Sequence, residues 1–177
     1  QNEAGAYAWG SFPSRIVEPP LRTSDFMVNL GGKWDGLQIV EGHPIQADIN
    51  SLEWSFENNM RVEFVPGAGS GQYANRALRE GRNQRLTFDR VFRDYILGQR
   101  RDDSETFVVY AKAEGSEYEA GHKYTVELIF PKVGVIATPR REDGKRLSEA
   151  ADLVILQDDT YGSVIVNVKN KVAAYAA

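Results

Sequence analysis

Histidine, cysteine and clustered acidic residues are the side chains best suited to hold a metal or move protons, and this chain has few of them. The histidines, His43 and His122, each follow a glycine, and neither belongs to a His-x-x-x-His motif or an acidic cluster. A metal site needs three or four convergent ligands, and there is no cysteine to supply a thiolate or a disulfide. The acidic pairs at 102–103 and 158–159 are typical of solvated turns. We therefore expect no metal and no cofactor.

Two further motifs could mark an enzyme, and both fail on spacing. Gly67-x-Gly69-x-Gly71 follows a predicted strand, but the dinucleotide fingerprint needs a glycine where Gln72 stands. The Gly-Lys-Ser/Thr of a nucleotide phosphate loop is missing, and Ser70 lies in no Gly-x-Ser-x-Gly elbow. We therefore expect a surface loop here and a protein that is not an enzyme.

Arginine is concentrated in one part of the chain, with eight arginines between positions 76 and 101. Its planar guanidinium group donates in a fork that suits carboxylates and phosphates. A nucleic-acid groove is one interpretation, but the aromatic residues here occupy core positions, not the stacking positions of such a groove. We favour ion pairs with acidic loops, within one copy or between copies, which would fix the register of subunits. The inter-subunit candidates are Arg76, Arg79, Arg82, Arg85, Arg140 and Arg141 with Glu117, Glu119, Asp158 and Asp159.

The spacing of apolar residues predicts the elements that position these side chains. Apolar and polar residues alternate with a period of two in many segments, which is the pattern of half-buried strands. Asn58-Asn59 fits a tight hairpin turn between two of them, because asparagine tolerates positive φ. The predicted strands are 25–30, 37–41, 49–57, 61–65, 84–88, 106–112, 124–130, 152–156 and 163–169.

Helical patterns are rarer. A short helix is possible over 73–80, and Asp89 can N-cap a helix from Arg90 to about Gln99. The polar segment 139–144 predicts a loop. Because strands do not alternate regularly with helices, a parallel doubly wound sheet is disfavoured. The predicted fold class is mainly β: a β-sandwich or barrel-like arrangement of antiparallel sheets with one flanking α-helix and long loops.

The length of 177 residues is that of one domain with a sizeable core. Residues 1–24 contain three prolines and no clear period, which predicts an N-terminal arm or loop, and residues 25–177 form the single predicted domain. No apolar run approaches the roughly 20 residues of a membrane helix. We therefore expect no membrane partner.

The C-terminal third resembles the major tail tube proteins of long-tailed, siphovirus-like bacteriophages and prophages. The segments that carry the resemblance are Lys123–Val133, Gly144–Ala150 and Gly162–Tyr175, and Leu86–Arg90 with Phe92–Tyr95 is compatible with it. The resemblance implies hexameric rings that stack into a hollow tube, through which DNA leaves the capsid without specific binding. It implies a virion tail component assembled in the host bacterial cytoplasm. Its partners would be copies of itself and the tape measure, terminator and distal tail proteins.

A tube of this kind needs a lumen surface and contacts between rings. An acidic lumen would let DNA slide, since a cationic wall would retain phosphate. The lumen-facing candidates are the glutamates predicted on the polar faces of strands: Glu53, Glu57, Glu63 and Glu127. The candidates for ring-to-ring contact are the loops predicted at 66–82 and 139–151.

Two alternatives remain at this point. One is a tail-terminator or head–tail joining protein, which would form one ring. The other is a carbohydrate-binding β-sandwich module that uses Trp9, Trp34 or Trp54 as a sugar platform. Trp54 lies on the apolar face of its predicted strand, which favours a core position.

Overall fold

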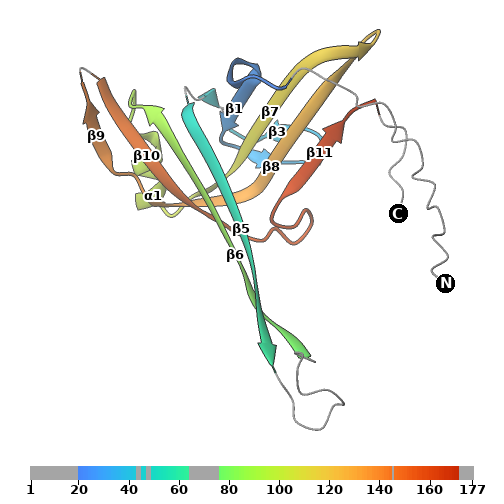
Figure 1. The fold of residues 1–177 in the computed structure, drawn as a ribbon. Coiled ribbons are helices and arrows are strands. Elements are labelled where there is room, and N and C mark those ends of the chain that lie inside the picture. Colours follow the sequence, from blue (N-terminus) through green and yellow to red (C-terminus); the bar gives the residue numbers. More distant parts are fainter. Residues whose placement is uncertain (1–19, 43–44, 47–48, 64–75, 145, 172–177) are drawn as a thin grey trace, which may run out of the picture.

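The computed structural model of the chain describes residues 20–42, 45–46, 49–63, 76–144 and 146–171. The fold is mainly β with a curled antiparallel sheet (Figure 1), which confirms the predicted class. The predicted division into an arm at 1–24 and one domain at 25–177 stays a prediction. The elements are η1 (Thr23–Asp25), β1 (Phe26–Leu30), β2 (Lys33–Trp34), β3 (Ile39–Val40), β4 (Ile45–Gln46), β5 (Ile49–Glu63), β6 (Arg76–Val91), α1 (Ile96–Asp102), β7 (Thr106–Glu119), β8 (His122–Ala137), β9 (Arg140–Asp143), β10 (Arg146–Ile155) and β11 (Ile165–Lys169).

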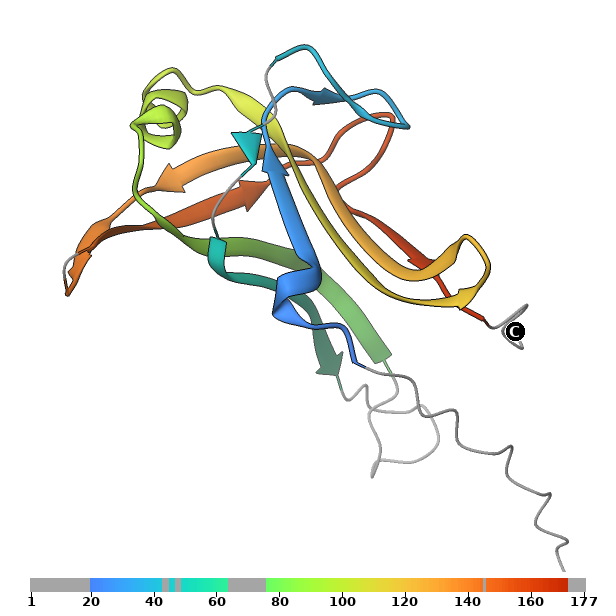
Figure 2. The ribbon, with the colours of Figure 1, turned by 90° about the horizontal axis from the view of Figure 1, so that it is seen from above.

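One large sheet organises the described part of the chain. Its strand order is β4-β1-β7-β8-β10-β6-β5, with β11 paired to β8 and β9 paired to β10. The sheet curls, so that strands far apart in this order face one another across the interior (Figure 2). Strands β2 and β3 form a separate two-stranded sheet.

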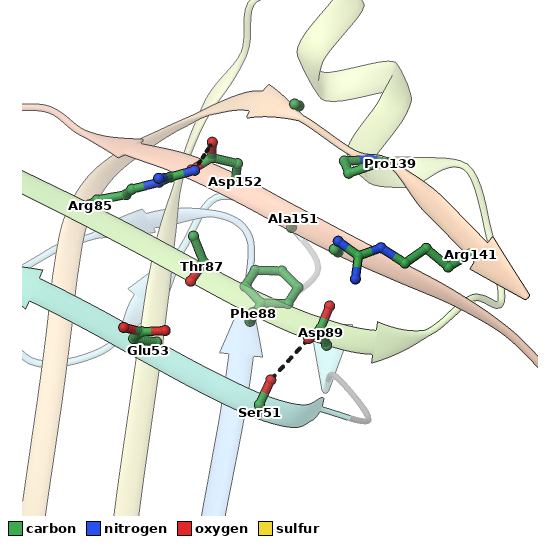
Figure 3. A pocket seen from close by; sticks show the side chains of 12 residues that line it. Ser51, Glu53, Arg85, Thr87, Phe88, Asp89, Pro139, Arg141, Ala151 and Asp152 are labelled. Carbon is green, nitrogen blue, oxygen red and sulfur yellow. Dashed lines mark hydrogen bonds and ion pairs between the residues drawn. The ribbon is translucent and has the colours of Figure 1, made fainter. Parts of the chain in front are cut away.

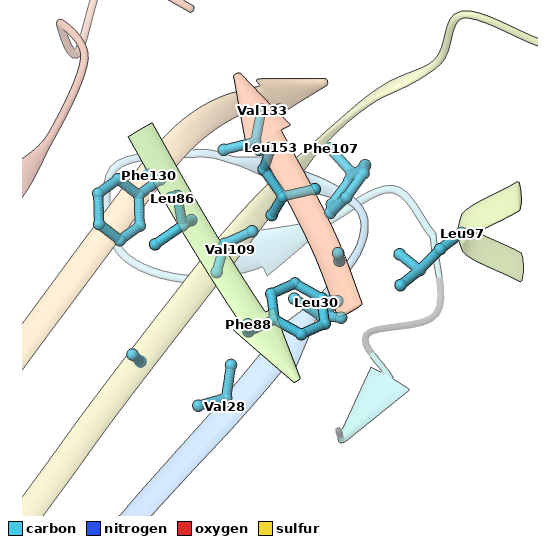
Figure 4. Packing of buried hydrophobic residues seen from close by; sticks show 12 residues of the cluster. Val28, Leu30, Leu86, Phe88, Leu97, Phe107, Val109, Phe130, Val133 and Leu153 are labelled. Atoms are coloured by element: carbon cyan, nitrogen blue, oxygen red, sulfur yellow. The ribbon is translucent and has the colours of Figure 1, made fainter. Parts of the chain in front are cut away.

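The core fills the inside of this curl. Leu86 and Phe88 of β6 pack there with Leu153 of β10 and Phe130 of β8 (Figure 4). Leu97 of α1 joins the same cluster, which is how the short helix is attached. Inward and outward residues alternate along each strand, because successive side chains of a strand point to opposite faces.

The predicted hairpin at Asn58-Asn59 is wrong. Strand β5 runs through both asparagines to Glu63, where Asn58 pairs with Arg82 and Asn59 with Gly81. A bulge follows, with one extra residue on β6, and Gly81 has φ 147°, a backbone conformation that glycine adopts without strain. Pairing to β6 along its whole length outweighs the turn preference of two asparagines.

The helix predictions were also partly wrong. Residues 76–80, within the short helix predicted at 73–80, belong to β6. Asp89 does not cap a helix, because β6 continues to Val91 and α1 begins at Ile96. The predicted loop at 139–144 is mostly strand β9, which pairs with β10.

Candidate functional site

The outer face of β5, β6 and β10 carries a shallow pocket of about 340 Å³ with several charged side chains in its lining (Figure 3). Arg85 donates two hydrogen bonds to Asp152, at 2.8 Å and 2.7 Å. This pairing raises the pKa of Arg85 above its ordinary value. Ser51 donates to Asp89 at 3.2 Å, but a serine that contacts only a carboxylate is not an activated nucleophile. The pocket therefore presents the Arg85–Asp152 ion pair and the Ser51–Asp89 hydrogen bond, with Glu53 and Arg141 also in its lining.

The most unusual surface is the ribbon, which we define as residues 56–63 of β5 with residues 76–84 of β6. It extends beyond the curled body of the sheet (Figure 1). On β5 the face that begins in the core with Leu52 and Trp54 continues through Phe56, Met60 and Val62, with the polar Asn58 between Phe56 and Met60. These last three side chains are 48%, 53% and 57% exposed. A core-facing pattern therefore continues where the described part of the chain supplies no core.

The ribbon also has a free edge. Among the described residues, β5 pairs only with β6, along up to 15 residues of strand. An unpaired strand edge presents a row of backbone donors and acceptors that another strand can satisfy. On its β5 strand the ribbon thus combines three exposed apolar side chains with an open hydrogen-bonding edge.

Strand β11 has the same two properties on a smaller scale. In the described part of the chain it pairs with β8 alone. Val166 and Val168 pair with Leu128 and Val126 of β8, so all four share one face, and Leu128 packs against the core. Val166 is 49% exposed and Val168 is 58% exposed. The inner face of the sheet is therefore uncovered at β11 also.

A groove of about 580 Å³ lies on the opposite, outer side of β11. There Glu127 accepts hydrogen bonds from Tyr110 Oη and Asn167 Nδ2, both at 3.2 Å. Partial burial, with the charge of Glu127 next in importance, raises the pKa of Tyr110. Trp34 stacks on Tyr110, with ring centroids 6.1 Å apart. The carboxylate of Glu127 is thus held by its neighbours in the same chain.

A charged cluster is buried beside α1. Glu149 of β10 is fully buried and Arg90 of β6 is 4% exposed. The two residues are direct cross-strand partners, and Arg90 Nη2 lies 2.8 Å from Glu149 Oε2. Arg90 also bonds Asp94, at 3.0 Å. Arg140 of β9 lies 3.6 Å from the other oxygen of Glu149, with its guanidinium 4.5 Å from the ring centre of Tyr95.

The candidate inter-subunit residues fall into three groups. Some are already engaged within the chain: Arg85 by Asp152, Arg140 by Glu149 and Tyr95, and Asp158, which accepts from the backbone N–H groups of Thr160 and Tyr161. Others are exposed, namely Arg82, Arg141, Glu117, Glu119 and Asp159. Arg76 and Arg79 belong to β6 by their backbone.

The four lumen-facing candidates do not form one cluster within the chain. Glu53, Glu57 and Glu63 share the outward face of β5 by alternation, and Glu63 is paired with Arg61 at 3.5 Å. Glu127 lies in the separate groove beside β11. Three of the four therefore share one face of one strand in a single copy.

Sequence reasoning missed the roles of Arg90 and Glu149. Arg90 was predicted to belong to a run of arginines and to begin a helix. The available signal was the phase of the alternation, because Arg90 follows Leu86 and Phe88 on the inward positions of its strand. Glu149 likewise precedes Ala151 and Leu153 on inward positions. A charge in the inward phase indicates a buried ion pair.

The remaining candidates show ordinary roles. His122 is exposed and stacks near Tyr118, with ring centroids 6.1 Å apart, while His43 and the glycine-rich segment 67–71 lie outside the described residues. Trp54 packs against the core, with its ring centroid 5.7 Å from that of Phe130. Among the residues described, no group of three or more potential metal ligands occurs. No helix in the same residues is long and apolar enough to span a membrane.

Comparison with known proteins gives a likeness of fold. No family model matches the chain, and no curated protein matches its sequence. A chain from the cryo-EM structure of the anti-feeding prophage (AFP) baseplate, 6-fold symmetrised, superposes with a TM-score of 0.51 at 12% identity, over 85% of this chain and 97% of that chain. A type six secretion system protein has a TM-score of 0.43 at 13% identity, over 80% and 91% of the two chains. Hcp1 from Salmonella typhimurium has a TM-score of 0.41 at 17% identity, over 80% and 92%. This protein therefore has a fold similar to that of the AFP baseplate chain.

Proposed function

We propose that this protein is a structural subunit that assembles with copies of itself into the stacked, hexameric rings of a phage-like tail tube. The observation that carries the proposal is the apolar face of β5, which continues from the core into the ribbon without any cover from the described part of the chain. Exposed apolar surface next to an open strand edge is a surface for assembly.

The fold supports the choice of a ring. The AFP baseplate structure that contains the similar chain is 6-fold symmetrised. The resemblance of residues 123–133 and 162–175 to major tail tube proteins implies the same ring number. In a closed ring every copy offers the same two surfaces to its neighbours, and the strand edges at these two surfaces are no longer open.

The outward face of β5 is the proposed lumen surface. It carries Glu53 and Glu57, both exposed, and Glu63. These negative charges would repel the phosphates of DNA, so that DNA could pass during ejection without being retained. The protein would then be a component of the virion tail, assembled in the host cytoplasm, with tape measure, terminator and distal tail proteins as its other partners.

Contacts between successive rings are proposed for two segments. The first is 66–82, whose described part is the end of the ribbon, and the second is 139–151, which contains the β9–β10 hairpin. Exposed Arg82 and Arg141 lie in these segments and would pair with acidic residues such as Glu117, Glu119 and Asp159 of another copy.

Negative-stain electron microscopy of the concentrated protein tests this function. We expect hollow tubes of stacked rings at high concentration. Single rings that never stack would instead favour a terminator or head–tail joining protein. A monomer at all concentrations would contradict the proposal, and a cryo-EM reconstruction in which the β5 glutamates point away from the channel would exclude their lumen role.

A further inference from the structure

We infer that the free edge of β5 in one copy pairs with the free edge of β11 in the next copy, so that one continuous sheet crosses each subunit boundary. This inference rests on the proposed assembly into rings and names the two strands that meet. Such a contact is heterologous, since two different surfaces of the chain join, and a heterologous contact closes into a ring when the rotation between copies permits.

Comparison of three edge strands of the described sheet, β4, β9 and β11, favours β11 as the mate of β5. Strand β4 has two residues, which is too short to cover the ribbon. Strand β9 reads Arg140-Arg141-Glu142-Asp143, and charged edge strands of this kind oppose pairing. Strand β11 has five residues, with Val166 and Val168 exposed on one face.

The two strands match face by face. On β5 the apolar residues Phe56, Met60 and Val62 continue the inner, core-facing side of the sheet. On β11, Val166 and Val168 lie on the inner side too, because they pair with Leu128 and Val126. Joining the two edges therefore extends one apolar face across the boundary, and a shift by one residue would place these side chains on the wrong face.

The outer faces are complementary in charge. The outward positions of β5 include the glutamates at 53, 57 and 63, whereas the outward face of β11 ends in Lys169, with Lys171 two residues beyond it. Cross-strand pairs of opposite charge stabilise a sheet and like charges oppose it. A second β5 offers one positive charge on this face, at Arg61, against three glutamates, so the charge pattern favours the heterologous contact with β11.

This pairing also reunites the lumen-facing candidates. Glu127 of β8 pairs with Asn167 on the outer side of β11. If β11 adjoins β5 of the neighbouring copy, Glu127 falls on the same surface as Glu53, Glu57 and Glu63 of that neighbour. The four glutamates then share one face of the joined sheet, together with Lys169 of β11.

Engineered cysteines test the pairing directly, because the natural chain has none. One set of variants carries Met60→Cys or Val62→Cys, and the other carries Val166→Cys or Val168→Cys. The two sets are mixed under assembling conditions, oxidised and separated on a non-reducing gel. Tyr95→Cys, at an exposed side chain beside α1, is mixed with Val62→Cys as the matched control.

We expect covalent dimers from at least one mixture of the two sets, at several times the yield of the control. A chain that carries both cysteines of the best pair should give a ladder of covalent oligomers that ends at the ring size. Dimers formed equally by Val62→Cys alone would overturn the inference, because they would indicate pairing of β5 with β5. Tubes seen by microscopy without any cross-link would overturn the pairing and leave the tube function intact, whereas absence of assembly would count against both.

A charge exchange provides an independent check. Lys169→Glu should raise the protein concentration needed for assembly by several-fold, since it places like charges across the proposed boundary. Adding Glu57→Lys to the same chain should recover most of this loss. Equal assembly of Lys169→Glu and the natural chain would contradict the pairing.

Discussion

Two regions of the molecule break the rule that charges face water and apolar side chains face the core, and they do so in opposite directions. Beside α1, the charges of Arg90 and Glu149 are buried. In the ribbon, Phe56, Met60 and Val62 are exposed. In each region, side chains lie where they would destabilise the folded chain if they had no partner.

The difference lies in where the missing partners are found. Glu149 has Arg90 at 2.8 Å and Arg140 at 3.6 Å, so the buried charge is compensated within one chain. The ribbon has no such compensation in the described residues. The first region therefore belongs to the folding of a single copy, and the second belongs to its association with other copies. Variants in the two regions should separate stability from assembly.

The largest expected effect is a loss of stability when the buried pair of Arg90 and Glu149 is broken. Glu149→Gln removes the negative charge and leaves Arg90 buried with only Asp94 as an acidic partner. Breaking a buried ion pair by removing one partner costs roughly 3–5 kcal/mol. We expect a loss of about 3 kcal/mol in the free energy of unfolding, measured by urea denaturation at a concentration where the protein is monomeric.

An exposed ion pair is the control for this variant. Asp152→Asn disrupts the pair with Arg85, which lies at the surface, and should cost less than about 1 kcal/mol. The double variant Arg90→Met with Glu149→Leu should recover most of the stability lost by Glu149→Gln, because apolar residues replace both charges. Equal effects of Glu149→Gln and Asp152→Asn would show that the buried cluster has no special role.

The same contrast explains what could be predicted from sequence. Alternation is a local signal, and it correctly indicated strands at 49–57 and 84–88 and the outward position of Glu53 and Glu57. Strand pairing is a long-range property, so the sequence did not reveal that Asn58-Asn59 continues a strand and pairs with Arg82 and Gly81. Which edges remain unpaired, and hence the candidate assembly site, depends on that pairing.

The second largest expected effect is on assembly, and it comes from a substitution in the ribbon. Val62→Ser removes an exposed apolar side chain, and surface substitutions usually change stability by less than about 0.5 kcal/mol. Burial of a valine in an interface contributes about 1.5 kcal/mol or more, and about 1.4 kcal/mol corresponds to a factor of ten. We expect unchanged unfolding and about a tenfold higher concentration for assembly, measured by light scattering.

Ile136 provides the matched control, because it is 55% exposed, nearly the same as Val62, but lies on β8 away from the ribbon. Ile136→Ser should leave the assembly concentration close to that of the natural chain. If both variants raised it equally, the ribbon would be no more important than any other exposed apolar residue.

The smallest effect concerns a charge that is neither buried nor uncompensated. Asp158 accepts hydrogen bonds from the backbone N–H groups of Tyr161 and Thr160, which lower its pKa below the ordinary 3.8. A carboxyl group whose pKa is lower in the folded state stabilises the fold above its unfolded pKa, and this contribution is lost as pH falls through the folded pKa. Asp158→Asn keeps a side-chain oxygen that accepts these hydrogen bonds but cannot titrate. The unfolding free energy of this variant should therefore fall less between about pH 4 and pH 2 than that of the natural chain.

Asp159→Asn, at an exposed carboxyl next to Asp158, is the control, and denaturation curves across this range measure both variants. If Asp158→Asn lost stability with falling pH as the natural chain does, the turn at Asp158 would add nothing to the acid sensitivity of the fold. The buried cluster of Arg90 and Glu149 would then be the region in which charge affects stability.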